Sequence, residues 1–211
     1  MPLNFTLGIT KSTMSIRFLS VLENFDKLFD MDGLDEFRDL VGSAVKRQER
    51  DLEKDAQSLK EMESEDEEQM EGYASHIEDR WMFLRDVDNL AGQLLIVALF
   101  RQAELHIKRV AKRTIAGIDT SKFFNFKAFK SAIPFDIEVL PNFLSFNELR
   151  MLNNAVKHQG KVSSELSTNF PAWKFDEELA GLDKTYERLK PELAVFIATF
   201  VAACYKVKQQ P

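Results

Sequence analysis

Apolar residues recur at steps of three and four along most of this chain, which is the spacing of one face of an α-helix. The first such stretch covers residues 12–30, and a second, very polar stretch begins near Leu34. A turn at residues 31–33 separates them. The second stretch has a thin apolar seam made of Leu34, Phe37, Val41, Val45, Leu52, Leu59 and Met62. A helix with so narrow an apolar stripe is expected to project from the protein or to pair with another helix.

Longer helices are predicted further along the chain. Residues 75–115 follow helical spacing, and their apolar run at residues 94–100 is expected to be buried on all sides. A shorter helix is expected over residues 123–133. The final helix has one clear apolar stripe, and Pro191 can start or kink it. The stripe consists of Leu189, Leu193, Phe196, Phe200 and Cys204.

The composition favours helices as well. Eight Gly and six Pro among 211 residues leave few turns for a β-sandwich. Hydrophobic residues make up 45% and charged residues 29%, which is typical of a soluble globular chain. We therefore expect an all-α fold, a helical bundle of about five to six helices with a long N-terminal helical arm. The arm covers residues 1–74 and includes an acidic run at residues 61–71, and the bundle covers residues 75–211.

Several classes of protein are disfavoured. The single cysteine, Cys204, excludes an intrachain disulfide and a zinc cluster built on thiolates. The apolar run at residues 94–100 is far shorter than the roughly 20 residues that span a bilayer, and no export signal is recognisable, so no membrane association and a cytoplasmic location are expected.

The charge is unevenly distributed along the chain. Residues 1–96 contain 11 basic and 22 acidic side chains, whereas residues 97–211 contain 17 basic and 12 acidic side chains. A basic half of an acidic protein can still attract a polyanion locally.

One predicted helix has a stripe of reactive polar side chains. Ser145 and Glu148 match a capping box at its start, and Gly160 can supply the left-handed residue at its end. The helix should therefore cover about residues 146–158. Its apolar stripe is Leu149, Leu152 and Val156. A different face presents Arg150, Asn154 and His158, at positions i, i+4 and i+8, together with Asn147 and Lys157.

This combination suits recognition and cleavage of a phosphodiester. Arg150 can hold a phosphate with paired donors, and His158 can move a proton near neutral pH. Asn154 can orient either group. The backbones of Arg150 and His158 lie about 12 Å apart along the helix, so their side chains must lean together or sites from two chains must meet. We therefore expect a homodimer.

A family resemblance is found in the same helix. The runs that match are Asn147-Glu148-Leu149-Arg150, Leu152-Asn153-Asn154 and Lys157-His158-Gln159-Gly160. They resemble the late-helix signature of the HEPN superfamily, the higher eukaryotes and prokaryotes nucleotide-binding domain. This resemblance implies an all-helical, commonly dimeric protein. It also implies a metal-independent endoribonuclease of prokaryotic toxin or antiphage defence systems, which acts on RNA.

The resemblance also implies roles for individual residues. Arg150 and His158 would be catalytic with Asn154 as an orienting residue, no metal or other cofactor would be needed, and an antitoxin or another defence-system protein would be a partner. The RNA-binding residues would be Asn147, Lys157 and Lys161. Seven residues separate Arg150 from His158, where the family motif has four to six, and Met151 replaces a polar residue.

An alternative function stays open. A polar stripe opposite an apolar one is found on ordinary surface helices, so the same residues also fit a non-catalytic helical dimerisation or regulatory module that binds a protein or RNA partner. Other enzyme classes find no motif in the chain. It contains no GxSxG elbow, no HExxH zinc motif and no Gly-rich phosphate loop.

Overall fold

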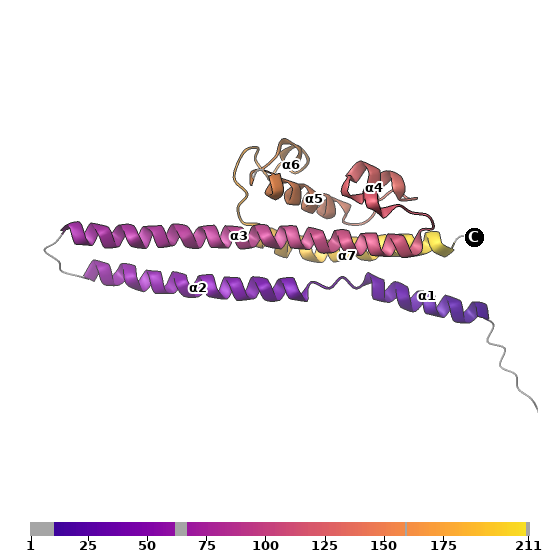
Figure 1. Ribbon diagram of the computed structural model, residues 1–211, viewed down its shortest axis with the longest axis horizontal. Helices are drawn as coiled ribbons and strands as arrows, with labels where there is room; N and C mark the ends of the chain where they lie inside the picture. Colours follow the sequence, from indigo (N-terminus) through magenta and orange to yellow (C-terminus); the bar gives the residue numbers. More distant parts are fainter. Residues whose placement is uncertain (1–10, 62–66, 159, 210–211) are drawn as a thin grey trace, which may run out of the picture. The chain divides into compact units, whose positions relative to one another are not determined.

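A computed structural model describes residues 11–61, 67–158 and 160–209 of the chain. These residues form α-helices and one short 3₁₀ helix without any β-strand, which confirms the predicted all-α fold (Figure 1). The central part of the predicted acidic run, residues 62–66, lies outside the described residues. The elements in chain order are α1 (Lys11–Lys27), α2 (Asp32–Glu61), α3 (Glu67–Thr114), the 3₁₀ helix η1 (Thr120–Phe124), α4 (Phe126–Ala132), α5 (Phe143–His158), α6 (Ser164–Asn169) and α7 (Leu182–Gln209).

The chain folds into two compact units, each assembled from separate stretches of sequence. The first unit combines Met1–Phe29, Ala103–Leu144 and Pro191–Pro211, and the second combines Asp30–Gln102 and Ser145–Lys190. The predicted boundary between arm and bundle, at residue 74, lies inside α3. No helix in the described part of the chain is long and apolar enough to cross a membrane.

In the second unit, α2 lies antiparallel beside the N-terminal half of α3 (Figure 1). Leu52 of the predicted apolar seam is completely buried. Arg80 of α3 reaches across to α2, where its guanidinium donates to Asp55 Oδ2 at 3.1 Å and to Gln48 Oε1 at 3.4 Å. The apolar seam of α2 therefore packs against α3 of the same chain.

The predicted turn at residues 31–33 is misplaced, because α2 already begins at Asp32, whose N–H donates to the side chain of Asp30.

The middle of α3 is buried on one side only. Leu95 and Leu99 are buried, but Leu90 and Leu94 are each about half exposed, so the predicted burial on all sides is wrong. The apolar side chains of this segment extend around more of the helix surface than the core covers. On the buried side, a Cβ on Gly92 would lie 3.0 Å from Leu182 Cβ, at the start of α7, and 3.2 Å from the next backbone nitrogen. A glycine is needed at this close approach.

In the first unit, the part of the predicted α7 stripe after Pro191 lies in the core. Leu193, Phe196, Phe200 and Cys204 are completely buried, and Leu189, which belongs to the second unit, is buried there as well. Aromatic rings from other elements pack on it: Phe129 lies 6.3 Å from Phe200, and Phe143 lies 6.3 Å from Phe196, between ring centroids. Pro191 does not start the helix, because α7 begins nine residues earlier at Leu182.

A buried polar cluster fastens the end of α1 within the first unit. The carboxylate of Asp26 is buried, accepts a hydrogen bond from the Tyr205 hydroxyl at 2.9 Å and forms an ion pair with Arg113. The backbone carbonyl of Asp26 lies 2.7 Å from His106 Nε2, and the Arg109 guanidinium lies 3.1 Å from His106 Nδ1. A carbonyl only accepts and a guanidinium only donates, so His106 is neutral with its proton on Nε2.

Candidate functional site

Helix α5, which contains the candidate residues, begins earlier than predicted. The chain turns at Asn142, which has a φ of 59°, and the N–H of Phe143 donates to the carbonyl of Leu140 at 3.1 Å. Because the helix starts at Phe143, Ser145 and Glu148 lie inside it, and the predicted capping box is wrong. At the other end the prediction for Gly160 is confirmed. Its φ is 66°, and its N–H donates to the carbonyl of Ala155 at 3.0 Å.

Glu148 has a different role from the predicted cap. Its buried carboxylate accepts a hydrogen bond from Trp173 Nε1 at 2.8 Å and two from Arg188, at 2.7 and 3.0 Å. Such a paired guanidinium–carboxylate contact is strong and directional. It ties α5 to the segment after α6 and to the start of α7. Trp173 and Arg188 are not among the residues predicted from the sequence, because they lie 25 and 40 residues from Glu148 and no local spacing marks them.

Arg150 is oriented by two neighbours. Its Nε donates to Asn147 Oδ1 at 3.1 Å, and its Nη2 lies 3.0 Å from Glu165 Oε1, on α6. Only 13% of the Arg150 side chain is exposed, whereas 59% of the Glu165 side chain is exposed. Asn147 is buried, so it holds the Arg150 side chain from the interior and is not exposed on the protein surface. Asn147 belongs to the predicted polar stripe, whereas Glu165 is not marked by the spacing of the predicted motif.

One face of the C-terminal half of α5 is open to solvent. Asn154, Lys157 and His158 are all exposed. The adjacent Asn153 is buried, with its Oδ1 lacking a hydrogen-bond partner in the described structure. His158 follows Arg150 by eight helical positions, about 12 Å along the axis. The structure therefore brings Arg150 together with Asn147 and Glu165, and it places His158 two turns away on the exposed part of the helix.

A small polar pocket lies just beyond the end of α5. Its volume is about 320 Å³. Lys161 at its rim is exposed and pairs with Asp176 at 3.3 Å. The amide side chains of Asn89 and Gln93 come from α3. The full set of lining residues is Asp86, Asn89, Leu90, Gln93, Gly160, Lys161, Glu178 and Leu179. The volume is at the lower end of the range for small-ligand sites.

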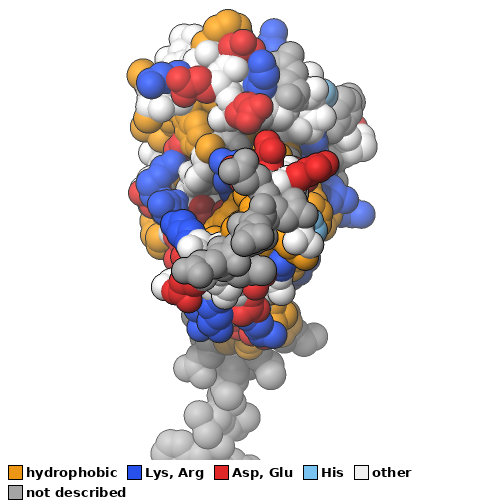
Figure 2. All heavy atoms as spheres, turned by 90° about the vertical axis from the view of Figure 1, so that its left-hand side faces the viewer, with side chains coloured by type: hydrophobic (Ala, Val, Ile, Leu, Met, Phe, Trp, Pro, Cys, Tyr) orange, Lys and Arg blue, Asp and Glu red, His pale blue; other side chains and the backbone are white. Residues whose placement is uncertain are grey.

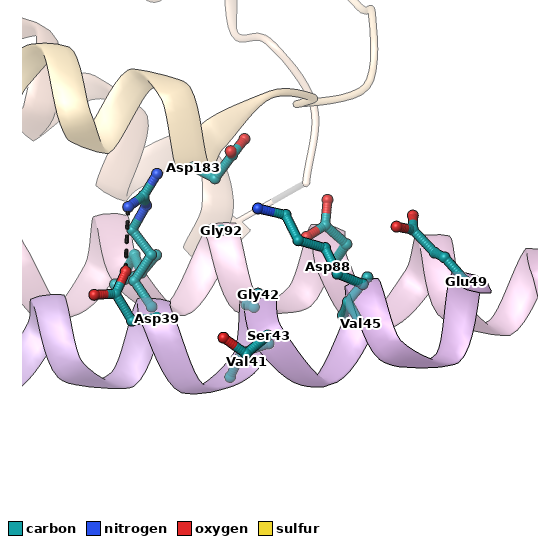
Figure 3. Close-up of a pocket in the computed structure, with 13 residues that line it drawn as sticks. Asp39, Val41, Gly42, Ser43, Val45, Glu49, Asp88, Gly92 and Asp183 are labelled. Atoms are coloured by element: carbon teal, nitrogen blue, oxygen red, sulfur yellow. Dashed lines mark ion pairs between the residues drawn. The ribbon is translucent and has the colours of Figure 1, made fainter. Parts of the chain in front are cut away.

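A larger pocket lies between α2, α3 and the start of α7, and its volume is about 460 Å³ (Figure 3). Arg38 in this pocket pairs with Asp39 at 3.5 Å and with Glu187 at 3.2 Å. Its charged lining residues are Arg38, Lys46, Asp39, Glu49, Asp88 and Asp183. Because acidic side chains outnumber basic ones, this pocket is a poor place for a phosphate backbone.

Next to that pocket, a three-residue network joins α2 to α7. Asp35 accepts a hydrogen bond from the buried Tyr186 hydroxyl at 2.8 Å, and the Lys190 ammonium lies 2.7 and 2.8 Å from its two oxygens. Burial raises the pKa of Tyr186, and the Asp35 carboxylate raises it further. The phenol therefore stays protonated and acts as a donor. This network explains how the start of α2 is held.

Charge on the surface is mixed. On the face shown in Figure 2, acidic and basic side chains are interspersed. Around α5 the cations Lys157 and Lys161 are exposed, while Arg150 and Lys161 each have a carboxylate partner. Any attraction for a polyanion at α5 must therefore come from a few local groups.

Comparisons with family models, with curated proteins and with solved structures found no match to this chain. The resemblance of residues 147–160 to the HEPN signature therefore stays a prediction.

Proposed function

We propose that this chain is a HEPN-like protein whose α5 surface binds RNA. In its catalytic form it would be a metal-independent endoribonuclease of a prokaryotic toxin or antiphage defence system, acting in the cytoplasm. One observation supports this proposal above the others. The Arg150 guanidinium is already aligned by Asn147 and Glu165, on a helix that also exposes Asn154 and His158.

The chemistry follows from these groups. The ribose 2′-oxygen forms a bond to phosphorus while the bond from phosphorus to the 5′-oxygen breaks. His158 takes the proton of the 2′-hydroxyl while water protonates the leaving 5′-oxygen, or His158 protonates the 5′-oxygen while water takes the 2′-proton, and Asn154 orients the reacting groups. Arg150 stabilises the charge that grows on the other phosphate oxygens. Because Glu165 is bound to Arg150 at rest, a phosphate must replace that carboxylate on the guanidinium.

A second candidate is a non-catalytic dimerisation or regulatory module that binds RNA or a protein, such as an antitoxin. The position of Arg150 favours it. The guanidinium is mostly buried, its charge is paired with Glu165, and His158 is two helical turns away. In this case the exposed groups of α5 would bind a partner without cutting it.

The deciding experiment is cleavage of single-stranded RNA by the purified protein in excess chelator. We expect His158→Ala and Arg150→Ala each to lower the rate by roughly 10²–10⁴-fold. His76→Ala is the matched control, because His76 is an exposed histidine on α3, and it should cut like the wild type. A folded wild-type protein that binds RNA without cutting it supports the second candidate. A protein that neither binds nor cuts RNA contradicts the proposal of an RNA-binding surface.

Glu165 offers a more specific test of the Arg150 site. Glu165→Gln removes the carboxylate that competes with phosphate. The Glu165 side chain is 59% exposed, and ion pairs at the protein surface are worth about 0.2–1 kcal/mol, so RNA affinity should rise by about 1.4- to 5-fold. Glu177→Gln is the control, because Glu177 also pairs with an exposed cation, Lys174, at 3.5 Å. Equal RNA affinity in both variants would mean that Arg150 does not contact phosphate.

A further inference from the structure

Helix α1, together with the two residues after it, has two apolar stripes. The inner stripe, Leu19, Leu22 and Phe29, is partly buried, and the buried Asp26 lies on the same side. The outer stripe consists of Phe18, Val21, Phe25 and Leu28, which are 63%, 50%, 67% and 69% exposed. A surface helix that packs only against its own protein needs a single stripe. The outer stripe is thus an apolar surface in excess of what the first unit requires.

The spacing of the outer stripe is that of a helix pair. Phe18, Val21, Phe25 and Leu28 are separated by three, four and three residues, which is the pattern of alternating a and d positions in a coiled coil. The charged residues Glu23 and Lys27 lie on another side of the helix and pair with each other at 2.6 Å. Among the α1 residues whose side chains are described, Phe18 to Lys27, pairing two such stripes therefore brings no like charges together.

We propose that the outer stripe of α1 is the contact between two copies of this chain, and that the two α1 helices pair antiparallel about a two-fold axis. Antiparallel pairing places Phe18 opposite Leu28 of the partner subunit and Phe25 opposite Val21 of the partner subunit. Every layer then contains one ring and one aliphatic side chain. Parallel pairing would instead alternate two rings with two valines or leucines, so that layers would be overfilled and underfilled in turn.

The area of the stripe indicates how strong the contact is. A large apolar side chain exposes on the order of 150–200 Å² when free, so the observed exposures correspond to roughly 450 Å² per chain and roughly 900 Å² for the pair. Stable complexes bury about 1,200–2,000 Å². The contact is therefore a weak one, and the dimer forms reversibly at micromolar or higher protein concentration. This inference does not depend on the proposed RNA chemistry.

The first test is sedimentation equilibrium of the full chain from about 1 to 300 µM. The wild type should approach twice its monomer mass of 24.3 kDa as concentration rises. Phe25→Glu should weaken dimerisation at least tenfold, because it places a charge between the helices. Phe83→Glu is the matched control, since Phe83 on α3 is also 67% exposed, and it should dimerise like the wild type. A monomeric wild type over the whole range, or equal effects of the two variants, overturns the proposal.

The second test addresses the direction of pairing. Val21→Cys and Phe25→Cys proteins of different mass are mixed and oxidised, and the native Cys204 is buried and should not react. Antiparallel pairing predicts that mixed disulfide dimers exceed the disulfide dimers of either variant alone. A majority of dimers between two Val21→Cys chains, or between two Phe25→Cys chains, shows that the pairing is not antiparallel.

Discussion

Acid should destabilise this protein through His106. Its imidazole is buried, with the Asp26 carbonyl on one nitrogen and the Arg109 guanidinium on the other. Burial first, and then the positive charge of Arg109, lowers the pKa of His106 from 6.5 to about 4. The folded protein therefore keeps this histidine neutral at a pH where the unfolded chain already binds a proton.

The size of the effect follows from the two pKa values. Below pH 6.5 the unfolded state gains a proton that the folded state does not gain until about pH 4, so the free energy of unfolding falls as the pH falls. Each pH unit in this window costs about 1.4 kcal/mol. The loss attributable to His106 is therefore about 2 kcal/mol between pH 7 and pH 5, and it levels off near 3 kcal/mol below pH 4.

The assay is urea unfolding, followed by circular dichroism, at pH 7, 6 and 5. In His106→Gln the amide can still donate to the Asp26 carbonyl and accept from Arg109, but it does not titrate. The carboxylates titrate alike in both proteins, so the difference between the two pH profiles isolates His106. His158→Gln serves as the control for an exposed histidine. Parallel profiles for the wild type and His106→Gln would refute the reasoning.

Two further predictions concern packing around α5 and α7. Gly92→Ala should destabilise the protein by about 1–3 kcal/mol in urea unfolding, because the added methyl meets the backbone at the start of α7. Gly72→Ala in the same helix meets nothing within 4 Å and should stabilise by about 0.5–1 kcal/mol, so equal effects of the two changes would contradict the close approach. Trp173→Phe should cost about 1–2 kcal/mol, because Glu148 loses one buried donor. If Trp173→Phe proved as stable as the wild type, this hydrogen bond would contribute nothing to holding α5.

The helices could be predicted because their signal is local and repeated. The stripe from Leu189 to Cys204 recurs at helical spacing over four turns, and all five residues are buried. Single residues predict the ends of helices less well than repeated patterns predict the helices themselves. Pro191 suggested a helix start, yet it lies inside α7, where the flanking turns supply enough hydrogen bonds and packing to tolerate it. The exposure of Leu90 and Leu94 could not be predicted, because the apolar spacing of a helix does not show how much of its surface other elements cover.

The candidate site could be predicted only in part. The positions of Arg150, Asn154 and His158 along one helix follow from helical geometry alone. What surrounds them depends on the chain after Gly160. That segment places Glu165 on Arg150, and Trp173 on Glu148, through contacts 15 and 25 residues apart in sequence. Such pairings depend on the whole fold, so no motif in residues 145–160 could reveal them.

The single cysteine gives this protein a natural reporter of its own opening. Cys204 is buried within α7, and burial raises the pKa of its thiol to about 12, although a hydrogen bond with Thr114 opposes the change. A thiol reagent needs both access and a thiolate, so it can modify only those molecules in which the C-terminal part of α7 has detached from its neighbours. The labelling rate under native conditions thus measures how often this detachment occurs, and no engineered probe is needed.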